Sequence, residues 1–405
     1  MRVTFLLSVT LGMVMLSSRV GSTVGAFGDD VAFLRKYTDV IVLRDRAGDA
    51  QIAVVPAWQG RVMTSAAAHD SLSFGWIHRD LIASRKIQPH INAFGGEDRL
   101  WLGPEAGQFG LFFAPGVKFD LDHWFVPQAL DTRPFEVTAR SSDKATFQAQ
   151  FSLANWSGTH FEVALQREVR VLEPRAAWAA LGTNPLREVA LVSYESINTL
   201  TNAGQEPWKR STGLLSLWIL GMFNPSPSAT IIAPIRQGSD TDYGPKVLSD
   251  YFGDVPPNRL KVTDRTIFFS GDGRFRSKIG INPKRSLGKL GSYDAEHRVL
   301  SIVLFDQPQG ATEYVNSLWK IQNDPYAGDA ANSYNDGPAS PGAKPLGPFF
   351  ELESSSPAAA LAPREHLTHT HRTFHLTGPQ EELDVVAREV LGVSLTEIQA
   401  ALTNH

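Results

Sequence analysis

Short runs of alternating or β-branched residues recur along the chain, separated by clusters of glycine, proline, asparagine and aspartate. The clearest runs are residues 39–43, 51–55, 135–139, 145–153, 159–172, 187–199, 229–235, 298–305 and 367–376. With 33 glycines and 25 prolines, this spacing is typical of strands joined by turns, and it disfavours a helical bundle or an alternating parallel sheet. Because an immunoglobulin-like sandwich takes only about 100 residues, we expect one larger β domain with more or longer strands.

Helical patterns are clearest near the C-terminus, at residues 380–391 and 394–402. Ser394 precedes Glu397 by three residues, which is the spacing of a capping box. We expect these helices to pack on the outside of the last strand. The expected division is a signal peptide at residues 1–26, a β domain at 30–377 and a helical cap at 378–405.

The first residues predict export from the cell. Arg2 is followed by an apolar stretch at residues 5–16, and Val24-Gly25-Ala26 offers small residues before a cleavage point. The later apolar run at residues 214–223 is well short of the roughly 20 residues that a membrane helix needs. We therefore expect a periplasmic or extracellular protein without a membrane span.

Composition excludes several classes of function. The chain has no cysteine, which rules out disulfides, thiolate metal sites and a cysteine nucleophile. Its net charge of −4 argues against a nucleic-acid partner, which usually requires a basic face. The sequence also contains no Walker-type phosphate loop, HExxH helix or GxSxG elbow.

The densest group of chemically active residues is the segment from Asn92 to Glu105. A Gly95-Gly96 turn is followed by acidic, basic and aromatic residues, namely Glu97, Asp98, Arg99, Trp101 and Glu105. A ligand rich in hydroxyl groups needs apolar planes beside such donors and acceptors. The same residues also fit a tight turn, a surface ion pair and a core tryptophan.

A second group follows a long segment rich in glycine, proline and asparagine, residues 323–348. On a strand, Glu351 and Glu353 would share one face, with Phe350 and Leu352 on the other. Two carboxylates aimed together are a candidate acid/base site, although a solvent-facing edge has the same pattern. The tyrosines of the long segment, Tyr326 and Tyr334, favour an ordered rim loop.

A third group is the histidine-rich segment from His366 to His375. On a strand, His369, His371 and His375 would share one face, where imidazoles bind a metal or act as a general acid. Histidines buried or exposed on a polar sheet face give the same pattern. We predict no metal site.

Three stretches together resemble a known group: residues 92–113 (NAFGGEDRLWLGPEAGQFGLFF), 332–337 (NSYNDG) and 347–358 (GPFFELESSSPA). They are similar to uncharacterised exported bacterial proteins related to the galactose mutarotase (aldose 1-epimerase) superfamily. The resemblance implies an all-β fold, a large antiparallel super-sandwich with a sugar-binding cleft on one sheet and no cofactor.

In epimerases of that superfamily, a late glutamate removes the proton of the anomeric hydroxyl group while a histidine protonates the ring oxygen. Leu352-Glu353 matches the glutamate motif, so the resemblance implies Glu353 as base, with Glu351 as the alternative. As the acid we expect a histidine such as His369 or His90. The segment corresponding to the family's Asn-His-x-Tyr motif, residues 195–202, contains no histidine. The expected sugar-binding residues are Asn92, Arg99, Trp101, Glu105, His90, Asn202, Tyr334 and Asp336.

The predicted function is carbohydrate binding with acid/base chemistry at the anomeric centre. Two alternatives stay open: glycan binding without turnover, and hydrolysis or elimination on a polysaccharide by Glu105 and Glu353. We expect Glu353 to face a cleft walled by Arg99, Trp101 and Glu105 and partly roofed by residues 323–348.

Overall fold

The computed structural model describes residues 25–68 and 71–402. The expected signal peptide lies outside the described residues, except for Gly25 and Ala26. No helix in the described ranges is long and apolar enough to cross a membrane.

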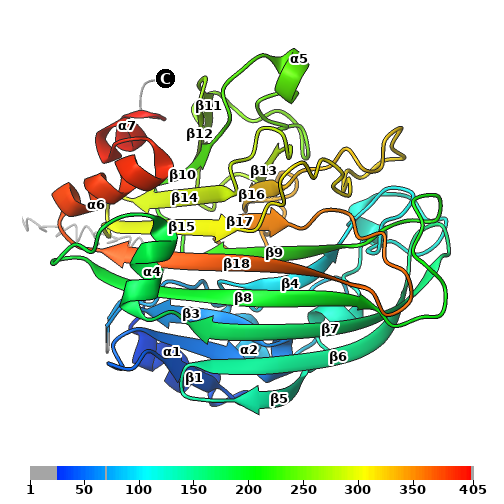
Figure 1. The fold of residues 1–405 in the computed structure, drawn as a ribbon, viewed down its shortest axis with the longest axis horizontal. Coiled ribbons are helices and arrows are strands. Elements are labelled where there is room, and N and C mark those ends of the chain that lie inside the picture. Colours follow the sequence, from blue (N-terminus) through cyan, green and yellow to red (C-terminus); the bar gives the residue numbers. More distant parts are fainter. Residues whose placement is uncertain (1–24, 69–70, 403–405) are drawn as a thin grey trace, which may run out of the picture.

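The strands form three antiparallel sheets (Figure 1). A three-stranded sheet has the order β1 (Ile41–Arg44), β2 (Gln51–Val55), β3 (Arg61–Ala66). A five-stranded sheet has the order β13 (Ser277–Ile281), β16 (Ala331–Asn335), β17 (Phe350–Ser355), β9 (Ser216–Phe223), β4 (Arg99–Gly103). A ten-stranded sheet has the order β11 (Leu260–Val262), β12 (Thr266–Ser270), β10 (Ala229–Pro234), β14 (Lys289–Asp294), β15 (Val299–Phe305), β18 (His366–Thr377), β8 (Ala190–Asn202), β7 (His160–Val171), β6 (Lys144–Ala154), β5 (Glu136–Arg140).

The predicted all-β class is confirmed, and each of the nine runs coincides with a strand to within three residues at either end. Strand β7 shows why alternating apolar and polar residues predict a strand. Phe161, Val163 and Leu165 are buried, whereas His160, Glu162 and Gln166 are exposed. One face of the strand therefore meets the core and the other meets solvent.

The two larger sheets pack face to face around a shared apolar core. Ile231 and Val303 of the ten-stranded sheet cluster with Ile279 and Leu352 of the five-stranded sheet. Toward the other edge, Val163 of β7 and Leu100 of β4 belong to a larger cluster that also includes the three-stranded sheet. The structure is therefore a sandwich in which the ten-stranded sheet spans both smaller sheets.

Helices are short and lie mainly outside the sandwich. They are α1 (Phe27–Leu34), α2 (Arg79–Ser84), α3 (Gln128–Asp131), α4 (Pro174–Leu181), α5 (Asp240–Tyr243), α6 (Gln380–Val386) and α7 (Leu395–Ala400), with the 3-10 turns η1 (Pro56–Trp58) and η2 (Leu121–His123) and the π-helical turn η3 (Ala387–Leu391).

The C-terminal helices cover the outer face of the ten-stranded sheet, as expected. Leu383 of α6 and Ile398 of α7 cluster with Phe374 and Leu376 of β18. The capping box at the start of α7 is present: Ser394 accepts from the Glu397 backbone, and the Glu397 side chain accepts from the Ser394 backbone. These helices lie at one end of the long strands, and the loops that follow β4 lie at the other (Figure 1).

One segment differs from the sequence expectation, and a second is a strand that the sequence did not predict. Residues 331–335 form strand β16 inside the stretch expected to be one irregular loop. Its polar side chains are buried but satisfied, since Asn335 accepts from the Gly273 amide and donates to the Phe275 carbonyl. The apolar run at 214–223 contains β9, a fully buried strand paired on both sides.

Candidate functional site

A cavity of about 160 Å³ opens on the face of the five-stranded sheet that points away from the ten-stranded sheet. Alternate residues reach it, for example Arg99 and Trp101 of β4, while Leu100 and Leu102 between them face the core. The loops after β4 and β15 contribute further walls. The lining includes Trp124, Trp218, Phe252, Arg276, Lys278, Trp319, Lys344, Leu346 and Phe349.

Aromatic rings form much of the wall. The Trp101 and Trp218 rings meet edge to face with centroids 5.5 Å apart, and the Trp124 and Trp319 rings stack at 6.1 Å. Trp124 is held in place because its indole Nε1 donates to Glu105 Oε1 over 2.8 Å. The cavity therefore offers flat apolar surfaces that ring contacts hold in position.

Arg99 and Glu351 form an ion pair at the cavity floor. Arg99 Nη2 lies 3.0 Å from Glu351 Oε1, and the guanidinium lies 3.9 Å from the centroid of the Trp101 ring. Burial raises the pKa of Glu351 to about 8, although Arg99 opposes the shift. The raised pKa brings this carboxyl into the range in which it can exchange a proton near neutral pH.

Lys278 and Glu353 form a second ion pair beside the first. Lys278 Nζ and Trp218 Nε1 each donate to Glu353 Oε2 over 2.9 Å. Burial lowers the pKa of Lys278, but the carboxylates of Glu353 and Glu105 outweigh it, so the net shift is upward. Lys278 therefore stays positively charged in the cavity wall.

Two further carboxyls lie in the wall. Asp336 accepts from the Tyr334 hydroxyl and from the Gly347 amide, each over 2.9 Å, and burial raises its pKa to about 6. Burial also raises the pKa of Glu105. The cavity thus combines carboxyl groups of different pKa with the cationic side chains of Arg99 and Lys278, each of which is hydrogen-bonded to a glutamate.

The structure brings together six of the residues singled out from the sequence: Arg99, Trp101, Glu105, Tyr334, Asp336 and Glu351 all line the cavity. Glu353 shares the strand face of Glu351, as alternation predicts, but is fully buried and does not line the cavity. It contacts the lining through Trp218 and Lys278. Part of the expected roof is present, because residues 337–346 contribute to the lining.

The other four singled-out residues lie outside the cavity lining. His90 stacks on Phe125 at 4.2 Å, and Asn92 donates to Asp131 over 2.7 Å. Asn202 donates to the Leu361 carbonyl over 3.0 Å. His369 lies between the two sheets, so none of these four side chains lines this cavity.

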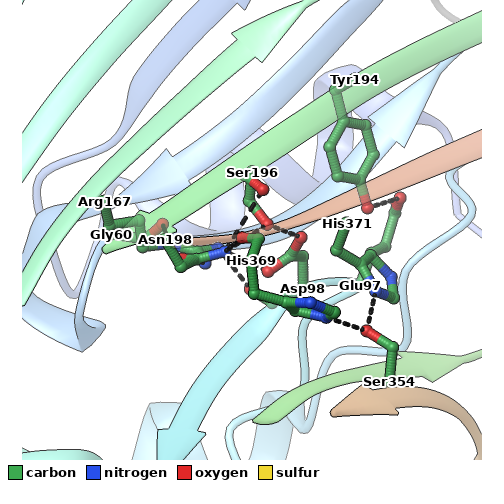
Figure 2. A network of polar contacts seen from close by, with 10 residues as sticks. All are labelled: Gly60, Glu97, Asp98, Arg167, Tyr194, Ser196, Asn198, Ser354, His369 and His371. Atoms are coloured by element: carbon green, nitrogen blue, oxygen red, sulfur yellow. Dashed lines mark hydrogen bonds and ion pairs between the residues drawn. The ribbon is translucent and has the colours of Figure 1, made fainter. Parts of the chain in front are cut away.

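The histidines belong to a polar layer inside the sandwich, part of which is drawn in Figure 2. His369 Nε2 and His371 Nδ1 each hydrogen-bond the Ser354 hydroxyl at 2.8 Å. Burial lowers their pKa values to about 3 and about 4, so both are neutral at physiological pH. Within the described ranges, no group of three metal-ligating side chains has the geometry of a metal site.

Glu97 and Asp98 anchor the same layer. Arg167 Nη2 donates to Asp98 Oδ1 over 2.5 Å and Ser196 donates to Asp98 Oδ2 over 2.7 Å. Glu97 Oε2 accepts from the Tyr194 hydroxyl over 3.0 Å (Figure 2). The Asn92–Glu105 segment therefore has two roles. Glu97 and Asp98 connect the two sheets, whereas Arg99, Trp101 and Glu105 line the cavity.

Sequence reasoning missed several lining residues, including Trp124, Trp218, Arg276, Lys278 and Trp319. Arg276 and Lys278 are two apart, so alternation could have put them on one face. Trp218 lies in a run in which every residue is buried, so no periodic signal distinguishes its face.

A model described as "Family of unknown function (DUF6786)" matches residues 25–402 of the chain. No curated protein matches the sequence.

Several solved structures resemble the fold. A putative aldose 1-epimerase from Escherichia coli K12 matches with 13% identity and a TM-score of 0.47, over 84% of this chain and 99% of that one. A galactose mutarotase-like protein from Lactobacillus casei ATCC 334 matches with 12% identity and a TM-score of 0.46, over 83% and 100%. The Slr1438 protein of Synechocystis sp. PCC 6803 matches with 13% identity and a TM-score of 0.48, over 84% and 96%. At such low values the likeness says nothing about substrate or activity.

Proposed function

Since the chain belongs to the DUF6786 family, whose function is unknown, we propose a function from the cavity itself: it binds a carbohydrate and catalyses proton transfer at the anomeric centre. The observation that carries the proposal is the convergence of aromatic planes, two ion pairs and ionisable carboxyls on one cavity. Sugar hydroxyls require paired donors and acceptors, and apolar ring faces require flat surfaces.

The size of the cavity supports a ligand of one ring. A cavity of roughly 150 Å³ accommodates a benzene molecule, and the volume here is about 160 Å³. One pyranose ring, free or at the end of a chain, is therefore the ligand unit that we propose.

Glu351 is the proposed proton donor, because it lines the cavity and burial raises its pKa to about 8. Asp336, with a pKa of about 6, is ionised at neutral pH and is the proposed acceptor. Protonation of the ring oxygen and removal of the anomeric hydroxyl proton would break the C1–O5 bond and give the open aldehyde. Ring closure on the other face would return both protons and invert C1.

Binding is tested first, by tryptophan fluorescence. The lining contains Trp101, Trp124, Trp218 and Trp319, so a bound sugar should change the emission. The panel would contain aldoses, uronic acids, sugar phosphates and short oligosaccharides. A panel in which no compound changes the emission or melting temperature would contradict the proposed function.

Catalysis is tested by following anomer exchange with NMR. Glu351→Gln should reduce exchange by at least about 10²-fold, the low end for an acid/base group, with binding retained. Glu353→Gln is the matched comparison, because Glu353 is the base implied by the sequence resemblance. If Glu353→Gln alone abolishes exchange, the Glu351 assignment is wrong. If every binding sugar exchanges no faster than in buffer, the protein binds without turnover, and a reducing-end assay then tests hydrolysis.

We also propose export, supported by Arg2 and the apolar residues 5–16. Cell fractionation with N-terminal sequencing tests it. A mature chain that starts between residues 18 and 30 would agree, and an uncut chain in the cytoplasm would contradict it.

A further inference from the structure

Two of the cationic side chains that line the cavity have no ion-pair partner in the described part of the chain, and the carboxyls Glu105 and Asp336 line the same cavity. Four cationic residues of the described chain line it: Arg99, Arg276, Lys278 and Lys344. Arg99 pairs with Glu351 and Lys278 with Glu353. Arg276 and Lys344 form no ion pair within the described residues.

Arg276 is half-buried at the cavity wall, next to an aromatic ring. Its guanidinium lies 3.7 Å from the centroid of Phe252, and a guanidinium stacked in this way keeps its planar edge free for an acceptor. Lys344 is exposed and lies in the segment of residues 337–346 that contributes to the lining. Both cations can therefore meet a ligand as it enters.

Arg99 is also incompletely satisfied. Its side chain is 3% exposed, and its Nε and Nη1 have no hydrogen-bond acceptor in the described ranges. A buried donor without an acceptor is costly, and charge-assisted bonds to a carboxylate or phosphate are about twice as strong as neutral ones. An anionic ligand would give Arg99 Nε and Nη1 stronger hydrogen-bond acceptors than a sugar hydroxyl group does.

We propose that the sugar bound in this cavity carries an anionic substituent, which Arg276 and Lys344 recognise at the wall and rim and Arg99 at the floor. This inference rests on the proposed function, and it narrows the ligand class from sugars to acidic sugars. A uronic acid carboxylate and a phosphate ester share the required chemistry, so the experiment has an arm for each.

The test compares matched sugars that differ in the anionic group. Binding of glucose, glucuronate and glucose 6-phosphate, and of galactose and galacturonate, is measured by tryptophan fluorescence and calorimetry at low and high salt. At least one anionic sugar should bind about tenfold or more tightly than its neutral partner, a difference of about 1.4 kcal/mol. Salt should weaken that binding, because the rim charges are screened. Inorganic phosphate is the probe for an ion without a sugar.

Variants connect the effect to the named residues. Arg276→Gln and Lys344→Gln should each weaken binding of the anionic sugar by at least about threefold more than binding of its neutral partner, which is within the range of exposed charge pairs. Arg274→Gln is the control, because Arg274 is exposed and lies outside the lining. Melting temperatures check that each variant is folded.

The outcomes separate the two proposals. If neutral sugars bind as tightly as their anionic partners, or if phosphate alone binds as tightly as a sugar phosphate, this inference is overturned and the proposed function stands. If no sugar binds, both are overturned.

Discussion

At the scale of single residues, the proton on Glu351 links the cavity to the stability of the fold. Burial raises the pKa of this carboxyl from 4.5 to about 8, so between these values the folded state binds more protons than the unfolded state. The contribution of this carboxyl to the free energy of unfolding is therefore fully present below pH 4.5 and is lost as the pH rises to about 8.

Glu351→Gln should remove this contribution, because the amide resembles the protonated carboxyl at every pH. The melting temperature of the wild type should fall more steeply between pH 5 and 8.5 than that of the variant. Asp336, whose pKa is also raised by burial, contributes to both proteins and cancels in the comparison. Parallel pH profiles would show that Glu351 does not titrate as described.

The buried ion pair between Asp98 and Arg167 allows a second test at this scale. Both side chains are fully buried, and Arg167 also donates to Asn198 and to the Gly60 carbonyl (Figure 2). Arg167→Met should lower the free energy of unfolding by about 3–5 kcal/mol, because it leaves an unpaired buried carboxylate.

Denaturant unfolding measures the effect of Arg167→Met. Arg46→Met is the control, since the Arg46 side chain is 92% exposed and should change stability by less than about 0.5 kcal/mol. A similarly small effect of Arg167→Met would mean that the polar layer does not depend on this pair.

At the scale of elements, the start of α7 has a sharply defined cap. Ser394→Ala removes the side-chain acceptor for the Glu397 amide and should cost about 1 kcal/mol. Thr396→Ala, at an exposed helical position, should change stability little. Equal effects in thermal unfolding would contradict the importance of the capping box.

Element prediction from sequence succeeded for alternating runs and for β-branched runs, and the latter include the fully buried strands β2 and β10. Strands β6 and β7 alternate between buried and exposed residues, so their hydrophobic pattern is visible along the chain. Strands β4, β9 and β16 are buried on both faces, and their sequences carry no such alternation. These three strands all belong to the cavity sheet, so the sheet that matters most for function had the weakest signal.

The burial of these strands on both faces also limited the prediction of the site. Glu351, Arg99 and Trp101 were found because charged and aromatic residues are unusual in an apolar strand. His369 is likewise a polar residue in a strand, but its side chain lies between the two sheets. The sequence cannot show which side of a strand buried on both faces meets a cavity. Convergence of residues 99, 278 and 351 depends on strand order, which no local pattern encodes.

At the scale of the whole molecule, the C-terminal helices shield one end of the large sheet. Deletion of residues 378–405 would expose Phe374 and Leu376, which pack against Leu383. The loss of stability should exceed the roughly 2–5 kcal/mol expected for Leu383→Ala alone. Unfolding curves and dye binding to exposed apolar surface would measure it, with deletion of residues 403–405 as the control. An unchanged melting temperature would show that the cap is dispensable.

The position of β18 has a consequence for how the chain is made. This strand lies between β15 and β8, so it joins two groups of strands that are synthesised much earlier. Until residue 377 has left the ribosome, both neighbours present an unpaired edge, and such edges are templates for aggregation. Long-range pairing of this kind is also slow. A nascent chain must therefore stay incompletely folded for most of its synthesis, and any product that ends before His366 keeps two open edges.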